Sequence, residues 1–224
     1  MEFLTRDEYF STVKEFNERG HSHWSTVPVK RWDYFGRTVN LIKELNLDNP
    51  SKILEMGTMG ITCVKDAHTI DYAEMWDFPG KQPTYLHDAR KVPWPIEDKS
   101  YDLFIALRVY QHLAPNQGEC IREAMRIAKK VIIVVPSNYN LPDMFPESRG
   151  ISYSDFTKYM NGIHPNLFTP TLVGNLFYWD TDNPSSLNIE GVMNPQILPE
   201  ELVKPPEKKS FSSIIKERIR QVFR

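Results

Sequence analysis

The stretch Ile53-Leu54-Glu55-Met56-Gly57-Thr58-Met59-Gly60 decides the fold class of this 224-residue chain. Apolar residues that run into an acid and two glycines are typical of a buried strand that ends in a tight turn. Because glycine lacks a Cβ atom, the backbone of such a turn can bend sharply and approach a bound ligand closely. The octapeptide alone fits ligand binding and an ordinary strand-to-loop turn equally well. Its meaning therefore depends on the segments around it.

The segments after residue 60 alternate between short strand patterns and a helix pattern. Strands are expected at Ala67–Asp71, Thr84–His87, Tyr101–Leu107 and Val131–Val135, with Leu176–Trp179 and Leu187–Val192 as closing strands. A helix is expected at Glu119–Lys129, where apolar residues recur at helical spacing: Ile121, Ala124, Met125 and Ala128. This alternation predicts an α/β fold, with a doubly wound, mostly parallel, seven-stranded sheet.

Helix patterns lie on both sides of this region. The first begins at a capping box, Thr5 with Glu8, and ends at Gly20. The second has an apolar face made by Trp32, Phe35, Val39 and Ile42. We therefore predict an N-terminal helical cap over residues 1–50 and an α/β domain over 51–193, with a lid at about 137–170. Residues 194–224 are expected to form a proline-rich linker and a basic amphipathic helix.

The composition excludes some classes of protein. A hydrophobic content of 41% is enough for one substantial core, and a net charge of −2 gives no overall attraction to nucleic acid. Cys63 and Cys120 are too far apart in sequence for a typical zinc site and too few for a disulfide framework. Charged residues near the N-terminus and the lack of a long apolar run favour a cytoplasmic protein. His21 and His23 have no carboxylate at ligand spacing, so no metal site is expected.

Carboxylates follow two of the predicted strands. In open α/β sheets, ligands bind outside the carboxyl ends of the strands. Asp71 closes the second strand, where an ionised carboxylate can accept hydrogen bonds from both hydroxyls of a ribose. Asp88 closes the third, where it can accept from the exocyclic amine of adenine while the N–H of Ala89 donates to the ring. The sequence thus predicts that Gly57, Asp71 and Asp88 surround an adenosyl ligand.

These residues resemble the class I S-adenosylmethionine-dependent methyltransferases, in the broad subgroup called type 11. The segment from Asp88-Ala89-Arg90 through Val92-Pro93-Trp94-Pro95 to Asp98-Lys99-Ser100-Tyr101-Asp102-Leu103 is similar to the family's D-A-x-x-L-P-F-x-D-x-S-F-D-L. Gln111-His112-Leu113 resembles its E-H-L, and Glu123-Ala124-Met125-Arg126-Ile127 its E-x-x-R-V. The resemblance covers roughly residues 50–136, and the ordered series is more specific than any single motif.

The resemblance implies S-adenosyl-L-methionine as the cofactor and S-adenosyl-L-homocysteine as the product. The residues that it places at the cofactor are Glu55, Gly57, Thr58, Gly60, Asp71, Asp88, Ala89, Leu107 and Arg108. Two features depart from the family pattern: the glycines are spaced Gly57-x-x-Gly60, and only about ten residues separate Gly60 from Asp71, too few for the usual helix and crossover. A short loop is expected to replace that helix. A nicotinamide cofactor fits less well, because its fingerprint is G-x-G-x-x-G.

Methyl transfer is an in-line displacement, and a hydroxyl acceptor must also lose a proton. His112 follows the fourth strand and has a pKa suited to that task, although a histidine there can equally well fix the loop. Tyr110 and Arg108 leave the same strand and are candidates for acceptor contact, or ordinary loop residues. His164, in the predicted lid, is a third catalytic candidate. The reaction we favour is O-methylation of a small molecule, such as a sugar or glycan precursor.

Other functions are compatible with the same motifs. N-methylation of an amine needs no general base, and a non-catalytic binding or scaffold protein could keep the fold with an irregular glycine loop. An oxidoreductase on a related sheet is a third hypothesis. The helix expected at residues 208–224 carries an apolar stripe and six basic residues, so it is a candidate for contact with a membrane surface, a partner or a second subunit. No nucleic acid partner is expected.

Overall fold

The computed structural model describes residues 1–47, 52–72, 82–138 and 147–183 of the chain. These residues belong to one compact unit. The helix predicted at 208–224 and the strand predicted at Leu187–Val192 lie outside the described residues. Among the described residues, no helix combines the length and the apolar character that a membrane span requires.

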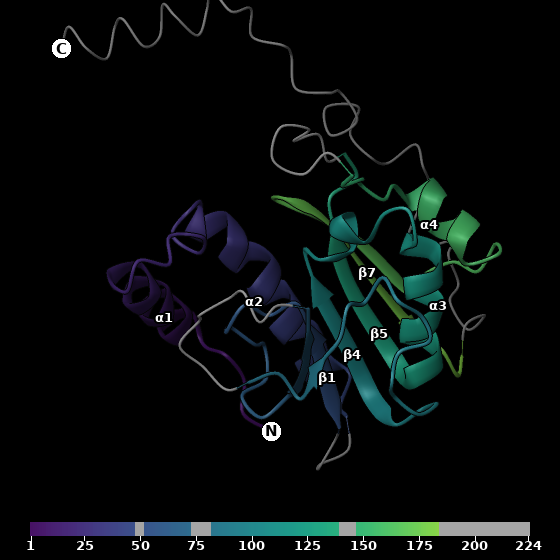
Figure 1. The fold of residues 1–224 in the computed structure, drawn as a ribbon, viewed down its shortest axis with the longest axis horizontal. Helices are drawn as coiled ribbons and strands as arrows, with labels where there is room; N and C mark the ends of the chain where they lie inside the picture. The colour runs from purple at the N-terminus through teal and green to yellow at the C-terminus, as the bar shows by residue number, and fades with distance from the viewer. Residues whose placement is uncertain (48–51, 73–81, 139–146, 184–224) are drawn as a thin grey trace, which may run out of the picture. The chain divides into compact units, whose positions relative to one another are not determined.

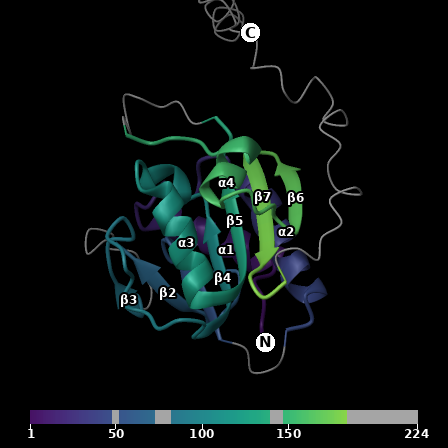
Figure 2. The same cartoon turned by 90° about the vertical axis from the view of Figure 1, so that its right-hand side faces the viewer.

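The described residues form a seven-stranded sheet in the order β3-β2-β1-β4-β5-β7-β6 (Figures 1 and 2). The first five strands are parallel neighbours: β1 (Ile53–Met56), β2 (His68–Asp71), β3 (Tyr85–Leu86), β4 (Tyr101–Leu107) and β5 (Ala128–Val135). The last two, β6 (Leu167–Thr171) and β7 (Gly174–Asp180), form a hairpin, and β7 runs antiparallel to β5. The predicted doubly wound, mostly parallel sheet is therefore present, with one antiparallel hairpin at its edge.

Two helices before the sheet cover one of its faces (Figure 1). Helix α1 (Arg6–Glu18) begins at the predicted capping box, in which Thr5 Oγ1 accepts from the N–H of Glu8 and the Glu8 carboxylate accepts from the N–H of Thr5. Helix α2 (Pro28–Glu44) buries the face that the sequence indicated. Their apolar residues form one core with the residues of β1, β4, β5 and β7 that point to the same side.

The opposite face of the sheet is covered by α3 (Gln117–Ile127), with α4 (Tyr153–Tyr159) beside it (Figure 2). The Phe156 ring of α4 stacks on Phe177 of β7 at a centroid distance of 4.3 Å and meets Trp179 edge-on. Helix α3 ends before the predicted Lys129, because Ala128–Lys130 already belong to β5. The helix prediction extended too far because alanine and lysine are good helix formers.

The segment predicted as a lid, at about 137–170, is described in part. Its described part contains α4 and the beginning of β6, so a closing strand that was not predicted lies at 167–171. The prediction missed β6 because its sequence, Leu-Phe-Thr-Pro-Thr, lacks regular alternation and contains Pro170. A proline is tolerated here because β6 is the edge strand. The other closing strand was predicted correctly at Leu176–Trp179 and is part of β7.

Candidate active site

The carboxyl ends of β1, β2 and β3 bring together the three residues predicted to surround a ligand. The N–H of Gly57 donates to the carbonyl of Ile70 at 3.0 Å, which places Gly57 level with the end of β2. Asp71 pairs with Leu86 of β3, and Asp88 follows Leu86 by two residues. Gly57, Asp71 and Asp88 therefore lie on one edge of the sheet, as the sequence predicted.

A short loop replaces the expected first helix, again as predicted. Residues 57–67 contain no helix, and the buried Glu55 holds the loop in place. Its two carboxylate oxygens accept from the N–H groups of Cys63 and Val64, each at 2.8 Å. Burial raises the pKa of Glu55 to about 7, although these two backbone hydrogen bonds act in the opposite direction. In this structure, Glu55 orders the loop.

The segment between α1 and α2 reaches over this loop. The indole N–H of Trp24 donates to the carbonyl of Met59 at 3.0 Å, and only 4% of Trp24 is exposed. Helix α2 places Phe35 beneath it, with the two rings 5.8 Å apart. Trp24 is therefore a packed residue of the core.

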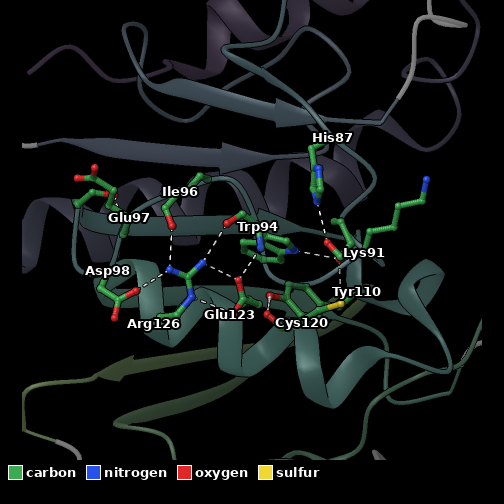
Figure 3. Close-up of polar contacts among 12 residues, drawn as sticks. His87, Lys91, Trp94, Ile96, Glu97, Asp98, Tyr110, Cys120, Glu123 and Arg126 are labelled. Atoms are coloured by element: carbon green, nitrogen blue, oxygen red, sulfur yellow. Dashed lines mark hydrogen bonds and ion pairs between the residues drawn. The ribbon is translucent and has the colours of Figure 1, made fainter.

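The loop after β3 is fastened to α3 by a hydrogen-bond network (Figure 3). The carbonyl of Ala89 accepts from the indole N–H of Trp94 at 2.9 Å and from the thiol of Cys120 at 3.2 Å. The N–H of Trp94 donates to the Glu123 carboxylate at 2.7 Å. These bonds fix the position of Ala89, whose neighbour Asp88 faces the carboxyl edge of the sheet.

Arg126 completes this network from the last turn of α3 (Figure 3). Its guanidinium donates to the carbonyls of Trp94 and Ile96 at 3.1 and 2.8 Å, and to both oxygens of Glu123 at 2.7 and 2.9 Å. It also pairs with Asp98 at 2.6 Å. Glu123, Arg126 and Asp98 are motif residues in the sequence, and the structure shows that they brace the loop after β3.

Asp88 already has a partner in this structure. The Arg90 guanidinium binds it in a fork, with Nε to Oδ1 and Nη2 to Oδ2 both at 3.0 Å. The hydrogen bond from Arg90 lowers the pKa of Asp88, so the carboxylate is ionised at neutral pH. An adenine amine would have to share this carboxylate with Arg90. The sequence does not reveal this ion pair. Asp88 and Arg90 are two residues apart, and the loop must turn before the guanidinium can reach both carboxylate oxygens.

The segment after β4 closes the space beside Gly57. Gly57 has a φ of +64°, and a Cβ atom there would lie only 2.5 Å from Cγ2 of Val109. The remaining cavity has a volume of about 10 Å³ and is lined by Trp24, Phe35, Glu55, Met56, Gly57, Thr58, Ile61, Ile105 and Leu107. Ligand sites usually measure about 300–1,000 Å³. The polar groups at this edge suit an adenosyl ligand, but the cavity must widen before one fits.

His112 lies on the short helix η1 (Tyr110–Leu113) after β4. The side-chain amide of Gln111 donates to the carbonyl of Arg108 and approaches His112 Nε2 at 3.0 Å, so this nitrogen is the acceptor. His112 Nδ1 then carries the proton and donates to Ser148 Oγ at 2.8 Å. Burial lowers the pKa of His112, so the ring is neutral at pH 7. The geometry matches the loop-fixing interpretation of His112.

Two of the predicted catalytic residues lie away from the site. Tyr110 is fully buried, and its hydroxyl donates to the carbonyl of Cys120 at 2.9 Å, so it is a core residue. His164 stacks on Tyr153, which packs against β6. Strands β5 and β7 separate β6 from β4, and strand spacing of about 4.8 Å puts roughly 14 Å between them. The structure thus places Tyr110 in the core and His164 beside β6, which spacing in the sequence does not reveal.

The remaining predicted cofactor residues follow the expected strands. Leu107, at the end of β4, lines the small cavity together with Thr58. Arg108 has a left-handed backbone with a φ of +64°, and its guanidinium donates to the carbonyl of Val173 in the β6–β7 turn. Gly60 also has a positive φ, which the turn of the loop requires. Arg108 therefore ties β4 to the hairpin, in addition to any contact with a ligand.

The fold has relatives among solved structures. An S-adenosylmethionine-dependent methyltransferase from Clostridium acetobutylicum superposes with a TM-score of 0.52 and 11% sequence identity, over 73% of this chain and 97% of that one. This chain has the class I methyltransferase fold. A methyltransferase of the same cofactor class from Aquifex aeolicus matches with a TM-score of 0.45 and 16% identity, over 62% of this chain and 86% of that one. No protein-family model and no curated protein matches the sequence.

Proposed function

We propose that this chain is an S-adenosylmethionine-dependent methyltransferase that methylates a hydroxyl of a small molecule, for which we favour a sugar. One observation carries the proposal: Gly57, Asp71 and Asp88 lie at the carboxyl ends of three adjacent parallel strands. In a sheet of this class, that edge is where nucleotide-like ligands bind. A bound S-adenosylmethionine supplies an electrophilic methyl group and leaves as S-adenosylhomocysteine.

The residues of this chain have separate roles in the proposal. Asp71 binds the ribose hydroxyls, and Asp88 and the N–H of Ala89 read the adenine edge. Glu55 holds the loop that carries Gly57 and Thr58. The neutral His112 ring lies beyond β4, and in the proposal it takes a proton from a hydroxyl acceptor only after the Gln111 amide releases Nε2. An amine acceptor would need no such base, so N-methylation is the alternative within the same class.

Calorimetric titration with S-adenosylmethionine tests the proposal. We expect binding by the full chain, and we expect Asp71→Ala to weaken it about 10- to 100-fold, because charge-assisted hydrogen bonds to the ribose contribute about 1.5–3 kcal/mol each. Asp66→Ala is the matched control, since Asp66 is an exposed carboxylate on the preceding loop. Equal weakening by both variants would contradict the role of Asp71. Failure of the unmodified chain to bind would contradict the function itself.

The small cavity beside Gly57 favours a second candidate function, a binding or scaffold protein that keeps the fold without turnover. The cavity at the place where the proposed cofactor would sit measures about 10 Å³, and Val109 packs against Gly57 at its edge. On the methyltransferase hypothesis, Val109 moves when the ligand enters, and this movement costs part of the binding free energy.

Val109→Ala separates the two candidates. If the cleft opens for a cofactor, we expect this variant to bind S-adenosylmethionine at least about threefold more tightly than the unmodified chain, because less side chain must be displaced. Val92→Ala, at an exposed valine, is the control. A scaffold protein would show no binding in either variant. Weaker binding by a folded Val109→Ala variant would mean that Val109 contacts the ligand and does not obstruct it.

A further inference from the structure

A second cavity, of about 590 Å³, opens where η1, α3 and α4 meet. Its volume is within the usual range for ligand sites, about 300–1,000 Å³. The polar residues around it are Gln117, Glu147, Arg149, Asp155 and Tyr159. None of them was assigned to the cofactor by the sequence motifs, and the cavity does not share a residue with the small one beside Gly57.

One side of this cavity is anchored to the core. Gln117 is only 2% exposed, and its amide donates to the carbonyls of Tyr110 and Arg149 at 2.9 and 2.8 Å. The Tyr159 ring lies against Gly118, where a Cβ atom would be 2.9 Å from Cδ1 of that ring. Glycine at this position therefore lets the tyrosine pack flat against the first turn of α3.

The cavity lies at the same edge of the sheet as the proposed cofactor site. The N–H of Arg149 donates to the carbonyl of Gln111 after β4, and that of Ile151 donates to the carbonyl of Pro136 after β5, both at 2.8 Å. The segment 109–115 connects the two places, since Val109 packs against Gly57 while Ala114 and Pro115 line the larger cavity. A ligand in this cavity is therefore next to the strand end where the methyl group would be presented.

The chemistry of the wall combines hydrogen-bond donors and acceptors. The carboxylates of Glu147 and Asp155 accept, the guanidinium of Arg149 donates, and the phenol of Tyr159 does both. Asp155 uses Oδ2 to cap α4 through Ser152, and no hydrogen bond of its Oδ1 is recorded among the described residues. A sugar hydroxyl also donates and accepts, and the apolar face of a sugar ring matches an aromatic side chain. The two carboxylates would repel an anionic ligand, and the guanidinium of Arg149 would repel a cationic one.

We propose that this cavity binds a carbohydrate of monosaccharide or disaccharide size. The statement that this sugar is the methyl acceptor rests on the proposed function. The binding itself does not, because the cavity is formed by residues other than those of the cofactor site. Two side chains of the site serve to test it: Tyr159 in α4 and Arg149 in the segment before this helix.

Saturation-transfer NMR on the full chain, without added cofactor, tests the inference. The probes are the methyl glycosides of glucose, mannose and galactose, with maltose and lactose as disaccharides. We expect transfer to at least one probe and a loss of at least about fivefold in Arg149→Gln and Tyr159→Ala, because each variant removes a contact group of the cavity. Lys158→Gln is the matched control, since Lys158 is an exposed residue of the same helix. Thermal melts identify any variant that fails to fold. Because Arg149 is exposed, we expect Arg149→Gln to fold and to test the site even if Tyr159→Ala does not.

Three results would overturn the inference: no transfer to any glycoside, transfer that persists in both variants, or transfer to 1,4-diaminobutane or succinate in place of the sugars. A parallel titration with S-adenosylmethionine keeps the two proposals apart. Cofactor binding without sugar binding refutes the carbohydrate site alone, and sugar binding without cofactor binding refutes the methyltransferase function alone.

Discussion

Glu55→Ala is expected to lower the free energy of unfolding by about 3–5 kcal/mol at pH 5, since two buried N–H groups lose their acceptors and a cavity remains. Cys63 is fully buried and Val64 is 5% exposed, so water reaches neither backbone group readily. The loop over residues 57–67, which replaces a helix, has no other described side chain that accepts from these two N–H groups. Urea unfolding followed by circular dichroism measures the loss.

The control for this experiment is Glu97→Ala, because Glu97 is exposed and its side chain makes no hydrogen bond recorded among the described residues. A surface substitution of this kind is expected to change stability by less than about 0.5 kcal/mol. If Glu55→Ala lowers the free energy of unfolding by as little as Glu97→Ala does, the two hydrogen bonds of Glu55 do not hold the loop.

The same substitution has an expected pH dependence. Burial raises the pKa of Glu55 from 4.5 to about 7 in the folded chain. Between these two values the folded state retains a proton that the unfolded state has released, so stability falls as the pH rises from about 4.5 to about 7 and then levels off. The loss caused by Glu55→Ala is therefore expected to be larger at pH 5 than at pH 8. A loss that grows with pH would contradict the raised pKa.

Arg126→Gln is expected to cost about 2–3 kcal/mol of stability, because its guanidinium joins two backbone carbonyls and a half-buried carboxylate. The side chain of Glu123 is 13% exposed and would lose its charged partner, whereas Asp98 is 75% exposed and contributes little. The substitution also frees the loop that holds Asp88 and Ala89. On the proposed function, S-adenosylmethionine therefore binds more weakly to this variant.

Arg122→Gln is the matched control for this prediction. Arg122 lies one turn earlier on α3, is exposed, and donates only a long hydrogen bond of 3.4 Å to the carbonyl of Tyr159. Urea unfolding and cofactor titration are measured on both variants. An equal loss of stability in the two would show that the network around Glu123 does not brace the loop after β3.

The sequence predicted the strands that are buried on both faces. β1, β4 and the apolar part of β5 were found because a parallel strand between two helical layers is mostly apolar. The capping box of α1 was found because its two hydrogen bonds join residues three apart. β6 was missed, since an edge strand needs neither an unbroken apolar run nor a full set of N–H groups.

The candidate site was predicted only in part. The positions of Gly57, Asp71 and Asp88 follow from strand order, which the alternation of strands and helices fixes. The motif residues Glu123 and Arg126 were recognised, but their task of bracing the loop after β3 was not. A sequence motif specifies only residue types and their spacing. The hydrogen-bond partners of those residues lie elsewhere in the chain, so the motif does not reveal them.

By itself, the sequence determined the fold class and the sheet edge at which a ligand would bind, because periodicity, caps and strand-end carboxylates are local properties of the chain. The tertiary structure alone decided that Val109 fills the space at Gly57, that Tyr110 is buried in the core, and that a cavity lies between α3 and α4. These are contacts between elements distant in sequence. They depend on how the packed side chains fill space, which no short stretch of sequence encodes.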